Sequence, residues 1–210
     1  KKNLNSMSLK QTVLLGLTGS IGMGKSTTAA MFLKQGIPVW DADSTVHKLY
    51  AKNGAAVEFF NQEIPSAVSN GEVSRVVLKK LIKEDINNLK KIEQIVHPLV
   101  AKDRLTFIEN SKKYNAPLIV LDIPLLFETG FYKLVDYIAV VTVDYTTQKQ
   151  RVLARESMTE EMFTQILDKQ VSNEEKKRKA DFIIPTETIE AAESKVQEII
   201  FQLERQVRNA

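Results

Sequence analysis

Eight residues near the start of the chain have the types and the spacing of a phosphate-binding loop. Residues 19–26 spell Gly-Ser-Ile-Gly-Met-Gly-Lys-Ser, which matches the pattern G-x-x-x-x-G-K-S. An apolar run precedes them and a helical pattern follows, which is the strand–loop–helix setting that the motif requires. Glycine backbone folds closely around a polyphosphate, and the N–H groups of the loop and of the helix N-terminus attract anions. We therefore expect the loop to bind a nucleoside triphosphate.

Two side chains of the loop have the chemistry to complete this site. The Lys25 ammonium can reach the β- and γ-phosphates, and the Ser26 hydroxyl can hold Mg²⁺. A second candidate for the metal is Asp122, which ends an apolar run at residues 118–121. Its carboxylate could hold a Mg²⁺-bound water, or the residue could begin a turn before Pro124.

Two carboxylates, Asp41 and Asp43, follow a predicted strand at residues 37–40. The carboxyl ends of parallel strands face the ligand crevice, so these side chains should emerge near the transferred phosphate. A carboxylate beside a substrate hydroxyl can orient it and accept its proton, and we favour Asp43 for this role. Alternatively, Asp43 or Ser44 caps a helix predicted over residues 45–50. A structural and a functional role are equally open for Asp41.

Two arginines, Arg151 and Arg155, stand four residues apart and are predicted to share one face of a helix that follows residue 144. Two guanidinium groups there can clamp a triphosphate and stabilise charge on the transferring group. The alternative is a surface ion pair with Glu156 or Glu160. Because the phosphate loop is present, we favour phosphate contact for at least one arginine.

Composition indicates one domain or one core with insertions, since the chain has 210 residues and is 43% hydrophobic. There is no cysteine, no apolar stretch of membrane-spanning length, and no apolar signal-peptide core in residues 1–6. These features favour a cytoplasmic protein without a membrane partner.

The net charge of +3 is low for a nucleic-acid-binding protein. The basic run at residues 176–179 follows two glutamates and is predicted to be a solvated helix face, so we expect no nucleic-acid partner. Oligomeric state is left unassigned.

Short apolar runs rich in β-branched residues predict buried strands, and helical patterns lie between them. The alternation predicts an α/β fold with a parallel sheet covered by helices on both sides. The strands are expected at residues 13–18, 37–40, 118–121, 137–143 and 182–184. The clearest helix is the last, where apolar residues recur at spacings of three and four from Ile189 to Val207.

Two regions exceed a minimal strand–helix alternation. The stretch between the second and third strands carries several helical patterns and predicts a helical insertion that forms part of a substrate site. A charged stretch after residue 145 predicts a mobile lid, in which Thr159 is the expected N-cap of a helix. The predicted single domain covers residues 10–210. Its core is about 10–43, 114–145 and 180–210, the insertion about 44–113, and the lid about 146–179.

Three classes of protein use such a loop: small-molecule kinases, regulatory GTPases and mechanical ATPases. A GTPase should carry an Asn-Lys-x-Asp segment that reads guanine, and the sequence has none. A mechanical ATPase usually needs a larger core and partners. The size, the insertion after the second strand and the late arginines favour a kinase.

The chain resembles the dephospho-CoA kinase family from about residue 12 to about residue 205. The combination of motifs is more specific than the phosphate loop alone. The matching segments, in order, are the phosphate loop, Asp41-Ala42-Asp43, His97-Pro98-Leu99-Val100, residues 123–128 (Ile-Pro-Leu-Leu-Phe-Glu), the Arg151/Arg155 pair, Gln170 and residues 180–184 (Ala-Asp-Phe-Ile-Ile).

The resemblance implies a P-loop kinase fold of the nucleoside monophosphate kinase type, with a CoA-binding insertion and a lid. It implies that ATP and Mg²⁺ are used to phosphorylate the ribose 3′-hydroxyl of dephospho-CoA. Asp43, Lys25 and Arg155 would then be catalytic, and Ser26 and Asp122 would hold the metal. The expected ATP-binding residues are Gly22, Met23, Gly24, Lys25, Ser26, Thr27 and Arg151. The expected acceptor-binding residues are Asp43, His97, Pro124, Leu125 and Leu126.

From its sequence alone, His97 before Pro98 is more typical of a helix end or a packing residue than of a functional one. The chain departs from the family pattern in two places: Pro185-Thr186 stand where the family often has Asn, and Glu156 follows the second arginine where Asp or Asn is frequent. The alternatives to this function are another small-molecule or nucleoside monophosphate kinase of the same fold, or a non-catalytic nucleotide-binding regulator.

Overall fold

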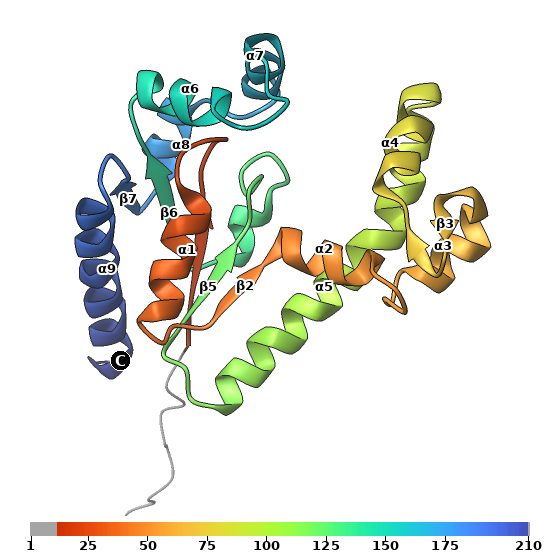
Figure 1. The fold of residues 1–210 in the computed structure, drawn as a ribbon. Coiled ribbons are helices and arrows are strands. Elements are labelled where there is room, and N and C mark those ends of the chain that lie inside the picture. The colour runs from red at the N-terminus through yellow and green to blue at the C-terminus, as the bar shows by residue number, and fades with distance from the viewer. Residues whose placement is uncertain (1–11, 210) are drawn as a thin grey trace, which may run out of the picture. The chain divides into compact units, whose positions relative to one another are not determined.

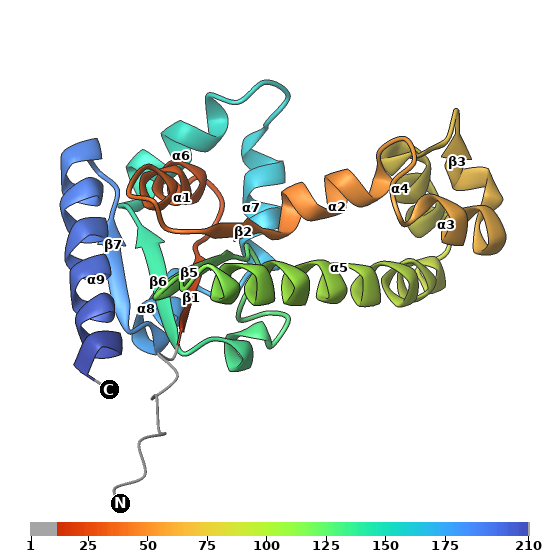
Figure 2. The ribbon, with the colours of Figure 1, turned by 90° about the horizontal axis from the view of Figure 1, so that it is seen from below.

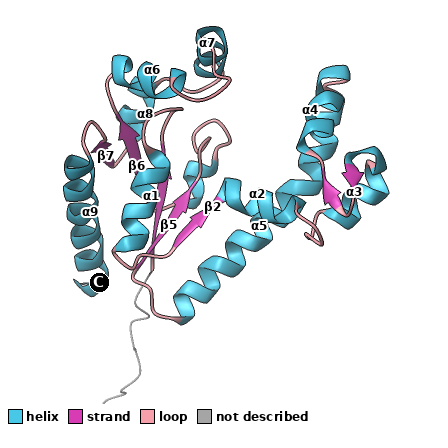
Figure 3. Cartoon of the chain, viewed as in Figure 1, coloured by secondary structure: helices cyan, strands magenta, loops and turns pink. Residues whose placement is uncertain are grey.

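A computed structural model describes residues 12–209 of the chain. The predicted boundary at residue 10 and the N-terminal residues 1–6 lie outside this range. The chain divides into two compact units: one contains the residues up to Trp40 and from Ser111 onward, and the other is Asp41–Asn110. Figures 1 and 3 show the helices and strands of each unit.

The first unit is built on a five-stranded sheet with the order β2-β5-β1-β6-β7. Its strands are β1 (Val13–Thr18), β2 (Val39–Asp41), β5 (Leu118–Asp122), β6 (Tyr137–Thr142) and β7 (Phe182–Pro185). The pairs β1–β5, β1–β6 and β6–β7 are parallel, so the predicted α/β class is confirmed. The second strand begins two residues later than predicted. Pro38 has no N–H to donate, and only its carbonyl joins the sheet, accepting from Val120 at 2.9 Å.

Apolar runs form these strands because both faces of the sheet are covered, and all five residues of β5 are buried. Two helices, α1 (Lys25–Lys34) and α9 (Ile189–Asn209), contact each other and pack over one face (Figures 1 and 2). The predicted apolar face of α9 is confirmed from Ala192 onward, but Ile189, the first residue of the predicted series, is exposed. The buried residues of this face are Ala192, Val196, Ile199, Leu203 and Val207.

Three short helices occupy the segment predicted as a lid: α6 (Tyr145–Leu153), α7 (Glu160–Asp168) and α8 (Asn173–Lys179). A side-chain oxygen caps each of them. The predicted cap at Thr159 is confirmed, since its hydroxyl accepts from the Met162 N–H at 3.2 Å. A single 3₁₀ turn, η2 (Phe131–Leu134), follows β5.

The second unit contains the region predicted as a helical insertion. Its elements are α2 (Ala42–Tyr50), α3 (Val57–Glu63), the 3₁₀ turn η1 (Pro65–Ala67), β3 (Val68–Ser69), β4 (Glu72–Val73), α4 (Arg75–Glu84) and most of α5 (Asn87–Lys113). It has its own apolar core, in which the rings of Tyr50 and Phe60 pack edge to face with their centroids 5.5 Å apart. The β3–β4 hairpin was not predicted, although Asn70-Gly71, both at positive φ, is a strong hairpin signal.

Helix α5 runs without interruption through Pro98, which lies inside it. The expectation that His97 marks a helix end or a packing position is therefore wrong, because His97 is an exposed mid-helix residue. Proline removes one backbone hydrogen bond from a helix, and a helix of 27 residues tolerates that loss. Among residues 12–209, no helix combines the length and the hydropathy needed to cross a lipid bilayer.

Candidate active site

The phosphate loop follows β1, the central strand, and leads directly into α1. Two of its glycines have positive φ, 78° at Gly22 and 86° at Gly24. A Cβ on Gly22 would lie 2.5 Å from the Val152 side chain, and one on Gly24 would lie 3.1 Å from Thr186. Glycine is therefore required at both positions by conformation and by space.

Lys25 forms an ion pair with Asp122 through its Nζ atom. Asp122 is the last residue of β5, stands opposite Leu17 of β1 and is 1% exposed. It does not begin a turn, because the pairing with β1 extends one residue further: the Ile123 N–H donates to the Leu17 carbonyl at 3.0 Å. The pairing, which sequence reasoning missed, places an ammonium group and a carboxylate at the end of two adjacent strands.

The other loop residues predicted to bind ATP lie at the N-terminus of α1. Ser26 and Thr27 are exposed in its first turn, whereas the Met23 side chain is buried, so Met23 can offer only its backbone to a ligand. A hydroxyl at Ser26 and a carboxylate at Asp122 are oxygen donors of the kind that Mg²⁺ prefers together with phosphate oxygens and water. The donor chemistry fits the predicted metal.

Three side chains outside the loop hold its backbone. The Gln148 amide donates to the Ile21 carbonyl at 2.7 Å, and the Ile21 N–H donates to Gln170 Oε1 at 3.3 Å. The Thr186 hydroxyl donates to the Met23 carbonyl at 2.8 Å. Sequence reasoning gave no role to Gln148 or Thr186. No local pattern marks a polar residue whose partner is more than 100 positions away.

The two arginines line one cavity of about 290 Å³ together with the phosphate loop. Arg151 donates to the Thr186 carbonyl at 2.7 Å and to its hydroxyl at 3.3 Å. Arg155 lies beyond the end of α6, so the prediction that both arginines share one helix face is wrong. The cavity is lined by Gly22, Gly24, Thr27, Thr28, Met31, Arg151, Arg155, Thr186, Thr188, Ile189 and Ala192.

Helix α6, which carries Gln148 and Arg151, begins at an aspartate cap. The Asp144 carboxylate accepts from the Thr147 hydroxyl and from the Thr147 N–H at 3.0 Å. These hydrogen bonds, first that of the hydroxyl, lower the pKa of Asp144. The alternative partner proposed for the arginines, Glu160, pairs instead with Lys149.

The basic run at residues 176–179 was predicted to be a solvated helix face, and this prediction is wrong for its first residue. Lys176 is fully buried, pairs with Glu128 at 3.0 Å and donates to the Ser20 hydroxyl of the phosphate loop at 3.4 Å. Glu128 also accepts from the Val171 N–H at 2.9 Å. A buried ammonium needs such a partner. Only the last three residues of the run face solvent to varying degrees, and Lys177 and Lys179 pair with glutamates of α8.

The two candidate carboxylates, Asp41 at the end of β2 and Asp43 in α2, have different environments. Asp41 caps α2, since its carboxylate accepts from the Ser44 N–H at 2.7 Å. The helix therefore begins at Ala42, earlier than predicted, and the suggested cap at Asp43 or Ser44 is wrong. Asp43 lies exposed in the first turn of α2, two residues after the end of β2.

The remaining predicted acceptor residues are divided between the units. His97 belongs to the second unit, on α5. Pro124, Leu125 and Leu126 belong to the first unit, in the turn after β5. Leu125 is exposed and can offer an apolar surface, whereas Leu126 is fully buried in the core.

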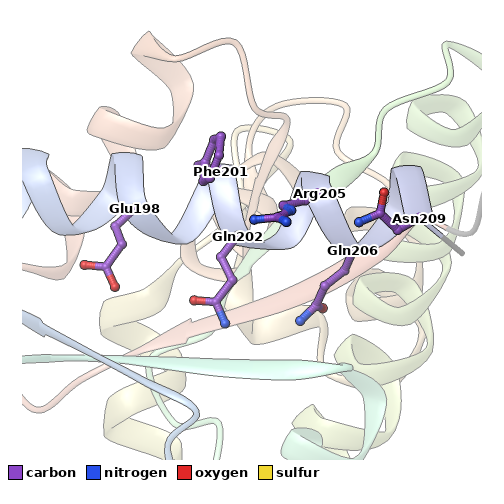
Figure 4. A pocket seen from close by; sticks show the side chains of 6 residues that line it. All are labelled: Glu198, Phe201, Gln202, Arg205, Gln206 and Asn209. Carbon is purple, nitrogen blue, oxygen red and sulfur yellow. The ribbon is translucent and has the colours of Figure 1, made fainter.

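A larger cavity of about 550 Å³ lies elsewhere, along the C-terminal half of α9 (Figure 4). Every residue lining it comes from this one helix, and none is a predicted site residue. They are Glu198, Phe201, Gln202, Arg205, Gln206 and Asn209.

The sheet order, the phosphate loop after the central strand and the nearby arginines define a P-loop α/β protein of the small-molecule kinase type. Comparison with known proteins is more specific, because the sequence model of the family "Dephospho-CoA kinase" matches residues 13–191. The chain belongs to the dephospho-CoA kinase family.

Individual relatives agree. A dephospho-CoA kinase from Ruegeria pomeroyi is 52% identical over 192 residues, which are 91% of this chain and 96% of that protein. One from Mesorhizobium japonicum is 48% identical over 195 residues, covering 92% and 98%. A crystal structure of a Thermus thermophilus protein is 29% identical, with a TM-score of 0.79 over 91% of this chain and 97% of that one. A Campylobacter jejuni dephospho-CoA kinase shares the fold, with a TM-score of 0.63, 21% identity, and coverage of 91% and 97%.

Proposed function

We propose that this protein transfers the γ-phosphoryl group of ATP to the ribose 3′-hydroxyl of dephospho-CoA, giving CoA and ADP. This would be the last step of coenzyme A synthesis. The observation that carries the proposal is a phosphate loop, with Lys25 at the start of α1, in a chain that matches the family over residues 13–191. ATP and dephospho-CoA are then its small-molecule substrates. A cytoplasmic location and the lack of nucleic-acid and membrane partners remain predictions.

In this proposal the phosphate loop and the cavity beside it bind ATP. The N–H groups of residues 22–27 and the Lys25 ammonium face the phosphates, where they stabilise the charge that develops during transfer. Arg151 and Arg155 line the same cavity, which supports a phosphate contact for both. The pairing of Lys25 with Asp122 keeps the ammonium at the ends of β1 and β5 before ATP enters.

Asp43 is the proposed general base. It follows β2 by two residues, it is exposed, and Asp41 already supplies the cap of α2. An aspartate in this position can accept the proton of the ribose hydroxyl as the oxygen attacks the γ-phosphorus. His97 and Leu125, both exposed, are proposed to contact the acceptor. Pro124 and Leu126 are proposed to shape the turn that presents Leu125 to the acceptor.

Ser26 and Asp122 are the proposed holders of Mg²⁺. When bound, the metal would neutralise charge on the β- and γ-phosphate oxygens. Asp122 would act on the metal through a bound water, because its carboxylate is buried and paired with Lys25.

The proposal is tested by measuring ADP release with ATP, Mg²⁺ and one acceptor at a time. The acceptors are dephospho-CoA, a panel of nucleoside monophosphates and shikimate. We expect turnover with dephospho-CoA that exceeds turnover with every other acceptor. Turnover with a monophosphate alone would assign the protein to another kinase class, and ATP binding without transfer to any acceptor would support a regulator.

A further inference from the structure

Two carbonyl groups of the phosphate loop accept hydrogen bonds from side chains of other segments, to which the proposed chemistry gives no role. The Ile21 carbonyl accepts from the Gln148 amide at 2.7 Å, and the Met23 carbonyl accepts from the Thr186 hydroxyl at 2.8 Å. Both side chains are buried, with exposed fractions of 3% for Gln148 and 7% for Thr186. They belong to the same compact unit as the loop.

The direction of each carbonyl fixes the direction of the next N–H. In a trans peptide the C=O of one residue and the N–H of the next point to opposite sides of the chain, and the structure contains no cis peptide among residues 12–209. Holding the Ile21 and Met23 carbonyls outward therefore turns the N–H groups of Gly22 and Gly24 to the opposite, inner side. Left-handed residues that alternate with right-handed ones make an anion-binding nest, and both glycines have positive φ.

The space around the two glycines agrees with this orientation. The direction in which a Cβ of Gly22 would point is toward α6, and that atom would lie 3.1 Å from the Gln148 backbone carbonyl oxygen. Gly24 faces Thr186 in the same way. Gln148 thus contacts the loop from a side that does not line the cavity, whereas Thr186 lines the cavity together with both glycines and the arginines.

We propose that Gln148 and Thr186 are positioning residues, which aim the N–H groups of Gly22 and Gly24 at the phosphates of ATP. The inference rests on the ATP site of the proposed function and adds the residues that set its geometry. Thr186 has a second part in it, since its carbonyl and hydroxyl also hold Arg151 at the edge of the cavity. Neither residue touches the acceptor in this account.

The test uses the full chain and direct titration with Mg²⁺-ATP and Mg²⁺-ADP. Thr186→Val removes the hydroxyl at nearly constant shape, and Thr186→Ser keeps it. Gln148→Met removes the amide, and Gln150→Met makes the same change at an exposed position of the same helix. Each misdirected N–H loses a hydrogen bond to a charged phosphate oxygen, so we expect about tenfold weaker nucleotide binding in Thr186→Val and Gln148→Met. Thr186→Ser restores most of the affinity, and Gln150→Met binds as the unmodified protein does.

A purely structural role would lower the melting temperature without a selective change in substrate constants. We expect the KM for ATP to rise in Thr186→Val and Gln148→Met while the KM for dephospho-CoA stays constant. Unchanged ATP affinity in folded Thr186→Val would overturn the proposal, as would equal effects of Gln148→Met and Gln150→Met. If Gln148→Met does not fold, the Val and Ser variants of Thr186 decide. Nucleotide titration needs no acceptor, so its outcome is separate from whether dephospho-CoA is the substrate.

Discussion

At the scale of single residues, the clearest result is the different roles of two aspartates, Asp41 and Asp43, that are separated by one residue. Asp41 accepts from the Ser44 N–H and starts α2, while Asp43 projects from the first turn without that duty. The sequence shows two carboxylates after β2. Only the residue at which α2 begins tells which of them is the cap and which is the candidate base. Helix starts are set by competition among neighbouring capping residues, and Asp41, Asp43 and Ser44 are all good caps.

Replacing the candidate base tests this assignment. We expect Asp43→Asn to lower kcat by about 10² or more, because a general base contributes typically 10²–10⁴. Asp41→Asn is the matched control, since asparagine is also a good N-cap and the helix keeps its start. Steady-state rates and circular dichroism of both variants provide the measurement. Near-normal kcat in folded Asp43→Asn would place the base elsewhere.

At the scale of elements, the strands and the last helix were predictable because a buried sheet and an amphipathic helix impose strong periodicity. The contacts of the segment from α6 to α8 were not. Its charged composition predicted a mobile lid but not that Gln148, Gln170 and Lys176 would all form hydrogen bonds to the phosphate loop. A polar residue can be buried only where it has a hydrogen-bond partner, and a partner far away in the sequence cannot be identified from local residue spacing.

The buried ion pair of α8 gives a stability prediction. Lys176→Met leaves the largely buried Glu128 carboxylate without its cation. We therefore expect the free energy of unfolding to fall by about 3–5 kcal/mol. Lys177→Met removes a partly exposed pair with Glu174 and should cost about 1 kcal/mol or less. Urea denaturation of both variants measures the difference. Equal midpoints would show that the Lys176 pair is no stronger than a surface pair.

The cap of α6 gives a pH dependence. The pKa of Asp144 is lowered by the hydrogen bonds from Thr147, so the carboxylate stabilises the folded state above the ordinary aspartate range. That contribution is lost as pH falls through the lowered pKa. Asp144→Ser keeps a cap that does not titrate. We expect the stability advantage of the unmodified protein over Asp144→Ser to shrink between neutral pH and about pH 3. A constant advantage across this range in thermal melts would contradict the assignment.

At the scale of the whole molecule, the chain contains two compact units with separate apolar cores. The first carries the phosphate loop and the arginines, and the second carries Asp43 and His97. The length of the stretch between β2 and β5 predicted an insertion. The short strands of the internal hairpin have little periodicity, and only its Asn70-Gly71 turn marks it in the sequence. The passage of α5 through Pro98 could not be predicted, because proline usually ends a helix.

The proposed division of substrates between the units can be tested with the two histidines of the chain. We expect His97→Ala to raise the KM for dephospho-CoA about tenfold through loss of a hydrogen bond to a charged acceptor, with the KM for ATP unchanged. His47→Ala, at an exposed position of α2 in the same unit, is the control. A rise in the KM for ATP, or equal effects of both changes, would remove His97 from the acceptor site.

The position of the transferred phosphate tests the central claim most directly. Dephospho-CoA is incubated with ATP, Mg²⁺ and the protein, and the product is examined by phosphorus NMR and mass spectrometry beside the 2′-deoxy and 3′-deoxy analogues of the acceptor. The account predicts one new phosphomonoester on the ribose 3′-oxygen, formed from dephospho-CoA and the 2′-deoxy analogue but not from the 3′-deoxy analogue. Phosphate on another atom, or turnover of the 3′-deoxy analogue, would contradict it.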